Sequence, residues 1–410
     1  MDTVEKLIAG VDLEVARRAI TSVAVRTPTI ASDELSEAAG GPVVLKAESL
    51  QRTGSFKLRG ALAKLSALAE RAGGGVVVAS AGNHARAVAE AARIRGLGCE
   101  VFMPAEAPVS KVASVERLGA SVRVAGGSFE EALELAEERS RETGAAFVHP
   151  FDDLDVIAGQ GTVGLELLED VPDLARVVVP VGGGGLASGI GVALRGARAE
   201  VELVGVQART YAPYAEALID GRSSSDSPLV TGATIADGIA VKRPGQITLP
   251  LLRELLDGLE TVTEDEIAGA MVLLAERSKL VAEGAGAVAA AALLSARLKP
   301  VSGTTVAIVS GGNVDSGLLA GLLRRRETEE GRRVRIFTQV PDRPGGLAEL
   351  LSLVAESRAN LLSLEHVREA IPLHVHETGV ELTLQIRGPK HSEEVLSALT
   401  AAGYEVSLRG

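Results

Sequence analysis

The chain of 410 residues is poor in aromatic side chains and in cysteine. It has no Trp, 3 Tyr, 6 Phe and a single cysteine, Cys99. One cysteine excludes a disulfide framework within the chain and favours a reducing compartment such as the cytoplasm. The apolar content therefore rests on small and aliphatic side chains, and the chain has 46 Gly. This composition is typical of α/β proteins with closely packed helices and strands.

An excess of basic residues and long apolar runs are also missing. The formal net charge is −12, which argues against nucleic acid and anionic membranes as partners. The longest apolar run, at 284–296, is too short to span a bilayer. Residues 1–20 are amphipathic and carry acidic side chains, unlike a secretory signal peptide. We therefore expect a cytoplasmic protein that binds neither membranes nor nucleic acid.

Short apolar runs alternate with helical patterns along most of the chain. Strand patterns such as 75–80 and 99–105 are each followed by a helical pattern. This βα rhythm predicts an α/β fold with a mainly parallel sheet. Further buried strands at 176–185 and 304–313 end in glycine, where open α/β sheets bind their ligands.

The composition changes at 324–333, where eight of ten residues are charged. We interpret this run as a solvated linker; the alternative is the charged end of a helix. Residues 334–410 then show strand and helix patterns in the order βαββαβ, which predicts helices on one antiparallel sheet. The serine-rich run at 222–228 is expected to form a surface loop.

Four consecutive glycines stand in "PVGGGGLASG" at 180–189, between a strand pattern and a helix pattern. Glycine lets the backbone approach a phosphate closely, and the helix start adds the positive end of its dipole. The run therefore predicts a phosphate site; the alternative is a tight structural turn. It is not a Walker A loop, and no acidic residue closes the next strand, at 201–207. That absence argues against a nicotinamide-dependent dehydrogenase.

Two further strand ends carry polar residues. "SAGNHA" at 80–85 places Ser80, Asn83 and His84 at a helix start, where side-chain and backbone donors suit a carboxylate. An ordinary helix cap is the alternative. "VSGGN" at 309–313 presents Ser310.

"SFKLRGA" at 55–61 places Lys57 beside Phe56 at the start of a helical pattern. Taken alone, Lys57 reads as a surface lysine. Together with a phosphate site and a carboxylate site, an amine next to a planar ring fits one cofactor, pyridoxal 5′-phosphate (PLP). The amine attacks the cofactor's aldehyde, and the ring delocalises the charge left when an amino acid loses its α-proton.

The motifs "SFKLRGA", "SAGNHA", "GGGGL" and "SGGN", in this order along the chain, resemble the fold type II PLP-dependent enzymes (tryptophan synthase β-like), and among them the threonine/serine dehydratase family. The resemblance implies two interleaved lobes, with a smaller lobe at about 40–145 inserted in the larger one and the cofactor between them. "PDRPGGLAEL" at 341–350 resembles ACT domains, regulatory modules that commonly bind amino acids. We therefore predict a catalytic domain at 1–323 and an ACT domain at 334–410.

The resemblance also implies roles for individual residues. Lys57 matches the lysine that attaches the cofactor and, once released, acts as the base. Asn83 matches the residue that hydrogen-bonds the cofactor's 3′-oxygen, and Ser310 matches the partner of its pyridine nitrogen. The phosphate loop would consist of Gly182, Gly183, Gly184, Gly185 and Leu186. The turn that would receive the substrate carboxylate consists of Ser80, Ala81, Gly82, Asn83 and His84.

Two of these positions restrict the chemistry. The hydroxyl of Ser310 can donate to a neutral pyridine nitrogen, so the electron sink is shallow and β-elimination is favoured over transamination. Ala81 stands where serine racemases of the family carry a serine that moves a proton on the second face of the cofactor. We therefore expect inefficient racemisation.

We expect no metal ion. Some relatives hold a divalent cation where this chain has Gln207, Tyr211 and Pro213, which together make a weak set of oxygen ligands. The only other metal-like spacing is His374 and His376, interpreted as a strand-edge or loop feature.

The predicted activity is PLP-dependent deamination of L-threonine to 2-oxobutanoate and ammonia, and of L-serine to pyruvate. The alternatives are a serine-preferring dehydratase, a serine racemase, and a catalytically idle amino-acid sensor, against which the intact Lys57 argues. The family resemblance further implies a homo-oligomer, a dimer or a tetramer. An amino-acid effector would bind the ACT domain near Gly345, Gly346 and Asn360. The sequence leaves open which effector binds and whether it activates.

Overall fold

The computed structural model describes residues 3–69, 75–220, 232–367 and 376–409. The chain forms two compact units, Met1–Asp315 and Ser316–Gly410. The predicted loop at 222–228 and His374 lie outside the described residues. No helix within the described ranges is both long and apolar enough to cross a membrane.

The first unit is built around a six-stranded sheet in which only the pair β1–β2 is antiparallel. Its central strands, β7 and β10, consist largely of β-branched residues and are buried on both faces, as is usual for parallel strands. In sheet order the strands are β1 (Thr29–Ala31), β2 (Val43–Ala47), β10 (Thr304–Val309), β7 (Leu174–Pro180), β8 (Glu202–Ala208) and β9 (Gly258–Val262).

A second, four-stranded parallel sheet forms the smaller lobe. Its strands in order are β5 (Ser121–Val124), β4 (Cys99–Met103), β3 (Val76–Ala79) and β6 (Ala146–Phe147). The prediction that this lobe begins near residue 40 is wrong, because β2 pairs with β10 in the larger sheet. The buried Val43, Leu45 and Ala47 give β2 the character of an interior strand.

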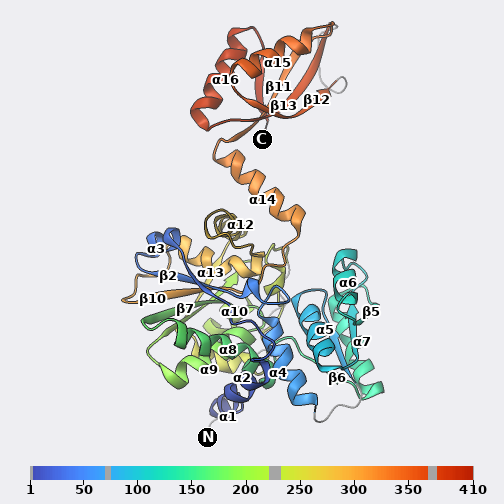
Figure 1. Ribbon diagram of the computed structural model, residues 1–410, viewed down its shortest axis with the longest axis vertical. Helices are drawn as coiled ribbons and strands as arrows, with labels where there is room; N and C mark the ends of the chain where they lie inside the picture. Colours follow the sequence, from blue (N-terminus) through green and yellow to red (C-terminus); the bar gives the residue numbers. More distant parts are fainter. Residues whose placement is uncertain (1–2, 70–74, 221–231, 368–375, 410) are drawn as a thin grey trace. The chain divides into compact units, whose positions relative to one another are not determined.

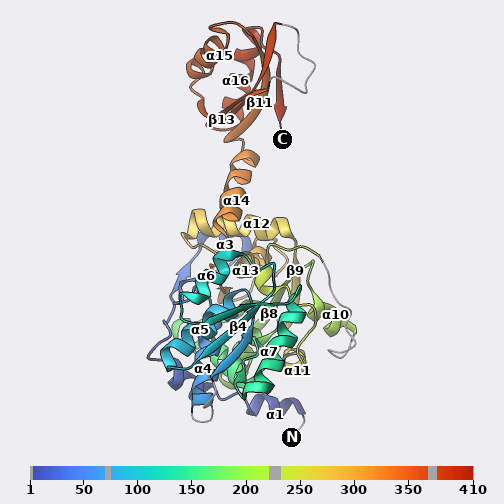
Figure 2. The ribbon, with the colours of Figure 1, turned by 90° about the vertical axis from the view of Figure 1, so that its right-hand side faces the viewer.

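Helices pack against both sheets (Figure 1). Those of the first unit are α1 (Thr3–Ala9), α2 (Leu13–Ile20), α3 (Asp33–Ala39), α4 (Lys57–Ala69), α5 (Asn83–Arg95), α6 (Val109–Glu116), α7 (Phe129–Thr143), α8 (Leu154–Asp170), α9 (Gly185–Ala197), α10 (Pro213–Asp220), α11 (Thr248–Leu255), α12 (Glu264–Leu273) and α13 (Gly284–Leu294), with short helical turns η1 (Glu48–Leu50), η2 (Asp237–Ile239) and η3 (Leu274–Ser278). Helices α5, α6 and α7 belong to the smaller lobe, where β4 lies between α5 and α7 (Figure 2).

Glycine allows the close packing that the composition predicts. A Cβ atom on Gly189 of α9 would overlap the carbonyl oxygen of Ile157 in α8, and one on Gly161 would lie 2.7 Å from the carbonyl oxygen of Gly189. The backbones of α8 and α9 therefore meet directly. Polar caps define other helix ends: the Ser128 hydroxyl accepts from the backbone N–H of Glu131 at 3.2 Å at the start of α7.

The second unit has the predicted βαββαβ order and forms an ACT-like antiparallel sheet with its own apolar core. Its elements are α14 (Ser316–Glu329), β11 (Arg333–Pro341), α15 (Gly346–Glu356), β12 (Asn360–Val367), β13 (Glu377–Gln385), α16 (Pro389–Ala401) and β14 (Val406–Arg409).

The interpretation of 324–333 as a linker is wrong for most of this run, because helix α14 continues to Glu329 and β11 begins at Arg333. Ion pairs one helical turn apart explain the outcome. Arg325 pairs with Glu329 and Arg326 with Glu330, each at 2.8 Å. Such pairs support a charged helix end, which was the alternative interpretation.

Candidate active site

The predicted motifs of the two lobes meet in space. "SAGNHA" follows β3 of the smaller sheet, whereas the glycine run and "VSGGN" follow β7 and β10 of the larger one. Asn83 of the smaller lobe donates to Glu283 of the larger lobe at 2.6 Å. The backbone N–H of Phe56 donates to the carbonyl oxygen of Ser310 at 3.1 Å. The glycine run joins them, because Gly183 lies against Phe151 while Lys57 bonds the neighbouring Pro150. The first unit therefore gathers these motifs at one site.

Lys57 is the first residue of α4 and its amine lies inside this site. Its Nζ donates to the carbonyl oxygen of Pro150 at 2.8 Å and lies 5.1 Å from the centroid of the Phe56 ring. Burial lowers the pKa of Lys57 from 10.5 to about 8, and the charge of Glu283 opposes the shift only in part. A substantial fraction of the amine is therefore neutral near physiological pH, as a nucleophile or base requires.

The glycine run forms a cradle that side chains would fill. A Cβ atom on Gly183 would overlap the ring of Phe151, and Gly184 adopts a φ of +88°. The carbonyl oxygen of Gly183 is turned away, accepting from Tyr214 Oη at 2.7 Å and Thr248 Oγ1 at 2.8 Å. In the described part of the chain, no acceptor bonds the backbone N–H groups of the predicted phosphate loop: Gly182, Gly183, Gly184, Gly185 and Leu186. Free donors at a helix start suit a phosphate.

The turn at 80–84 offers backbone donors and the side-chain amide of Asn83, but not the side chain of His84. The imidazole of His84 is buried and bonds the carbonyl oxygen of Val148 at 2.9 Å, and burial lowers its pKa to about 3. The prediction that this side chain offers a donor to a ligand is therefore wrong. The hydroxyl of Ser80 accepts from the N–H of Gly82 at 3.1 Å. The N–H groups of Asn83 and His84, at the start of α5, have no acceptor among the described residues.

Ser310 stands at the end of β10 and is 3% exposed. Among the described residues its hydroxyl makes one long contact, 3.4 Å, with the carbonyl oxygen of Ala285. It is therefore available to a ligand atom at this strand end. The glycine cradle, the free N–H groups, the Lys57 amine and this hydroxyl are the groups that PLP needs, so the residues present fit that cofactor.

Sequence reasoning missed Glu283 and Asn313. The side-chain amide of Asn83 bonds both, donating to Glu283 Oε1 and accepting from Asn313 Nδ2 at 2.7 Å. Burial raises the pKa of Glu283 to about 7, and the charge of Asp237 adds to this shift. A signal was present, because Glu283 is a lone acid in the apolar run "LVAEGAGAV" at 280–288.

Two of the residues at the position of the relatives' cation site, Gln207 and Tyr211, use their side chains in hydrogen bonds to other protein groups. Gln207 donates to the carbonyl oxygen of Val181 at 3.1 Å and accepts from the N–H groups of Tyr214 and Ala215. Tyr211 Oη donates to the carbonyl oxygen of Gly232 at 2.9 Å. The described residues contain no group of three or more His, Cys, Asp or Glu side chains placed to hold a metal. The expected absence of a metal stays a prediction.

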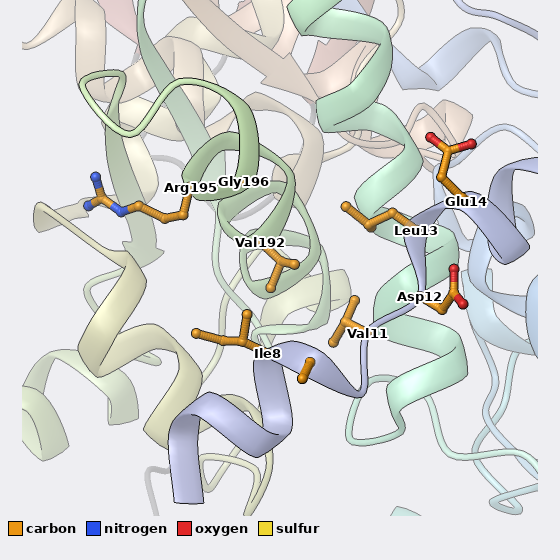
Figure 3. Close-up of a pocket in the computed structure, with 9 residues that line it drawn as sticks. Ile8, Val11, Asp12, Leu13, Glu14, Val192, Arg195 and Gly196 are labelled. Atoms are coloured by element: carbon orange, nitrogen blue, oxygen red, sulfur yellow. The ribbon is translucent and has the colours of Figure 1, made fainter. Parts of the chain in front are cut away.

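A separate surface depression lies where α1 and α2 meet α9. The side chains of Ile8, Val11 and Val192 point toward one another there (Figure 3). It contains none of the predicted site residues, so it is distinct from the site at the strand ends.

The family model described as "Pyridoxal-phosphate dependent enzyme" matches residues 20–311. The chain belongs to this family, and the predicted fold type II architecture and PLP cofactor are confirmed. More particularly, the chain is 47% identical over 402 residues to an L-threonine ammonia-lyase of Thermotoga maritima. The match covers 97% of this chain and 99% of that protein.

Two solved structures carry the same fold. A threonine deaminase from T.th. is 39% identical with a TM-score of 0.68, and the match covers 74% of this chain and 97% of that one. A maize serine racemase is 34% identical with a TM-score of 0.72, and the match covers 78% of this chain and 98% of that one.

Proposed function

We propose that this enzyme deaminates L-threonine to 2-oxobutanoate and ammonia by β-elimination, and L-serine to pyruvate. One observation carries the proposal: the Lys57 amine lies in the same site as the glycine cradle and Ser310. Identity over nearly the whole length to an L-threonine ammonia-lyase supports the choice of substrate.

PLP, when bound, supplies an electron sink for negative charge at the substrate's α-carbon. The phosphate loop would hold its phosphate through backbone N–H groups, and Asn83 would donate to its 3′-oxygen. The Ser310 hydroxyl would donate to the pyridine nitrogen without protonating it. Lys57 would hold the aldehyde carbon covalently until substrate arrives.

The chain's own groups then perform the proton transfer. The free N–H groups at the start of α5 hold the substrate carboxylate, which orients the Cα–H bond. The neutral Lys57 amine removes the α-proton, because its pKa of about 8 makes it basic yet substantially unprotonated. The α-proton and the β-hydroxyl are lost together as one water molecule, breaking the Cα–H and Cβ–O bonds. A proton then adds to Cβ and a second water molecule adds at Cα as ammonia is released, so the atoms balance.

Serine racemisation is the second candidate, favoured by the similarity to the maize enzyme. Ala81 argues against it, since its methyl group cannot carry a proton to the second face of the substrate. We expect wild-type protein to form keto acid far faster than D-serine, and Ala81→Ser to raise D-serine formation. Equal racemase and lyase rates in the wild type would contradict the argument.

The test of the main proposal is keto acid release from L-threonine and L-serine by PLP-loaded protein. We expect turnover of both substrates, measured by coupled reduction of the keto acid. PLP-loaded protein that released keto acid from neither substrate would overturn the proposal. The same assay with isoleucine, valine and nucleotide monophosphates tests regulation.

We further propose that the ACT-like unit binds an amino-acid effector near the turn at 341–346. Gly345 adopts a φ of +92° before α15. The N–H of Gly346, which we expected to be free for the effector's carboxylate, instead donates to the carbonyl oxygen of Arg343 at 3.1 Å. The Asn360 amide donates to Gln385 Oε1 at 3.1 Å, a bond that an effector would have to replace. The homo-oligomer and the cytoplasmic location stay predictions from the sequence.

A further inference from the structure

The side-chain amide of Asn83 is held at both ends. Its oxygen accepts from Asn313 Nδ2 at 2.7 Å, and its nitrogen donates to Glu283 Oε1 at 2.6 Å. An amide nitrogen carries two hydrogens. One N–H of Asn83 therefore stays available for a ligand, and its direction is set by the two neighbours.

Asn313 is itself fully engaged. Besides Asn83, its nitrogen donates to the carbonyl oxygen of Thr53 at 2.9 Å, and its oxygen accepts from Arg86 Nη1 at 2.7 Å. This pattern assigns the amide orientation of Asn313 and, through it, that of Asn83. The chain Arg86–Asn313–Asn83–Glu283 has a cation at one end and a carboxyl group at the other, which polarises the bonds between them.

Two motif glycines make room for this network. A Cβ atom on Gly54, just before "SFK", would overlap the amide oxygen of Asn313. A Cβ atom on Gly311, within "SGGN", would overlap Oε1 of Glu283 and lie 3.3 Å from Nδ2 of Asn83. Glycine at these positions therefore serves the support of Asn83 as well as the approach of the cofactor.

We propose that Glu283 and Asn313 are positioning residues that hold Asn83 with one N–H directed at the 3′-oxygen of PLP, and that the protonation of Glu283 couples pH to cofactor affinity. The inference rests on the role proposed for Asn83. Neither residue needs to touch the substrate.

The surroundings of Glu283 support the coupling. Burial raises its pKa to about 7, and the charge of Asp237 of η2 adds to this shift. The Asn83 bond, the charge of Lys111 of α6 and a backbone bond from Asn313 oppose it. Lys57 of α4 and Arg86 of α5 also face this carboxyl group; burial lowers the pKa of each, and the charge of Glu283 opposes that shift. An ionised carboxylate is a stronger hydrogen-bond acceptor than a protonated carboxyl group. Protonation of Glu283 as pH drops through about 7 therefore weakens its bond to Asn83 and lowers the affinity for PLP.

The experiment measures the PLP dissociation constant of cofactor-stripped full-length protein by absorbance titration between pH 6 and pH 8. We expect wild-type affinity to fall roughly threefold to tenfold from pH 8 to pH 6. Glu283→Gln keeps the hydrogen-bond acceptor but does not titrate, so the contribution of Glu283 to the pH dependence should be absent. The contribution of Lys57, whose pKa of about 8 lies in the same range, remains in both proteins and cancels in the ratio of their dissociation constants. The control Glu260→Gln removes a carboxylate on β9, outside the network, and should behave like wild type.

Asn313 is tested by a double-mutant cycle in the same assay. Asn313→Ala and Asn83→Ala should each weaken PLP binding, and the double variant should be no weaker than Asn83→Ala alone. Fully additive losses, or a Glu283→Gln variant with the wild-type pH dependence, would overturn the inference. Because no threonine is used, these outcomes are independent of the proposed lyase activity; a wild-type protein that bound no PLP would instead contradict the cofactor site itself. Unfolding curves of each stripped variant confirm that it is folded.

Discussion

Burial decides the acid–base properties of two residues in the site. Lys57 has a pKa lowered to about 8 and Glu283 a pKa raised to about 7, because each charge is removed from water. Both groups therefore change protonation near neutral pH, which is unusual for lysine and glutamate. Titratable groups shifted toward neutrality are typical of catalytic sites.

Lys57→Ala removes the covalent attachment and the base together. We expect turnover of L-threonine to fall by at least about 10³-fold, with loss of the protein-bound PLP absorbance band. The matched control is Lys64→Ala on the same helix, where the amine pairs with Asp153 at 2.7 Å, outside the site. That variant should keep the band and most of its activity. Wild-type turnover in Lys57→Ala would contradict the assigned role.

Glu283→Gln should change how stability depends on pH. The pKa of Glu283 rises from 4.5 to about 7 on folding, so between these values the folded state holds a proton that the unfolded state has released. The free energy of unfolding of wild type therefore falls as pH rises through this window.

In cofactor-stripped protein, the stability of Glu283→Gln relative to wild type should thus be higher at pH 8 than at pH 4.5, by on the order of 1–3 kcal/mol. Urea unfolding at the two pH values measures the difference. A relative stability that did not change with pH would show that Glu283 titrates normally.

At the scale of elements, the site depends on where strands end. The carboxyl ends of β7 and β10 lie in the larger sheet, and that of β3 lies in the smaller one. Each is followed by glycine or by the free N–H groups of a helix start, so the backbone supplies much of the binding surface. The close contact of Phe151 with the glycine run makes this surface intolerant of added side chains.

Gly183→Ala tests this intolerance. The added methyl group would overlap the Phe151 ring, so we expect PLP affinity to fall at least about tenfold and stability to fall by about 1–3 kcal/mol. The control Gly196→Ala lies near the end of helix α9, which follows the glycine run, and there the new Cβ would meet no atom within 4 Å. It should leave affinity unchanged and stabilise the protein by up to about 1 kcal/mol. Equal effects of the two substitutions would contradict the geometry.

At the scale of the whole molecule, the chain divides into two units with separate apolar cores. The family model ends at residue 311, just before this division. The residues matched by this model, 20–311, lie within the first unit, so we expect that unit alone to carry the catalytic activity.

Removal of residues 334–410 should therefore leave an enzyme that loads PLP and releases keto acid. We expect its kcat to stay within a few-fold of the full chain, while any response to amino-acid effectors is lost. Initial rates with and without isoleucine or valine measure both properties. A shortened enzyme that still responded to these effectors would place the effector site in the first unit.

Local signals in the sequence determined the class of protein. The βα rhythm, the glycine run after a valine-rich strand, and Lys57 in "SFKLRGA" each act over a few residues, so they can be read without knowing the fold. With the polar strand ends they predicted the cofactor and, through resemblance to known enzymes, the fold type II architecture. The ACT-like second unit was predicted from the βαββαβ pattern at 334–410 and from "PDRPGGLAEL". The predicted start of the smaller lobe near residue 40 was wrong, because strand pairing, unlike strand formation, is not a local property.

The tertiary structure alone decided which side chains support the site. Asn83 meets Glu283 across 200 residues of sequence and Asn313 across 230, and no periodic pattern connects them. It also decided that His84 faces the core, although its neighbour Asn83 faces the site. The physical reason is the same in each case: burial and hydrogen-bond partners depend on the order in which the sheets bring distant strand ends together.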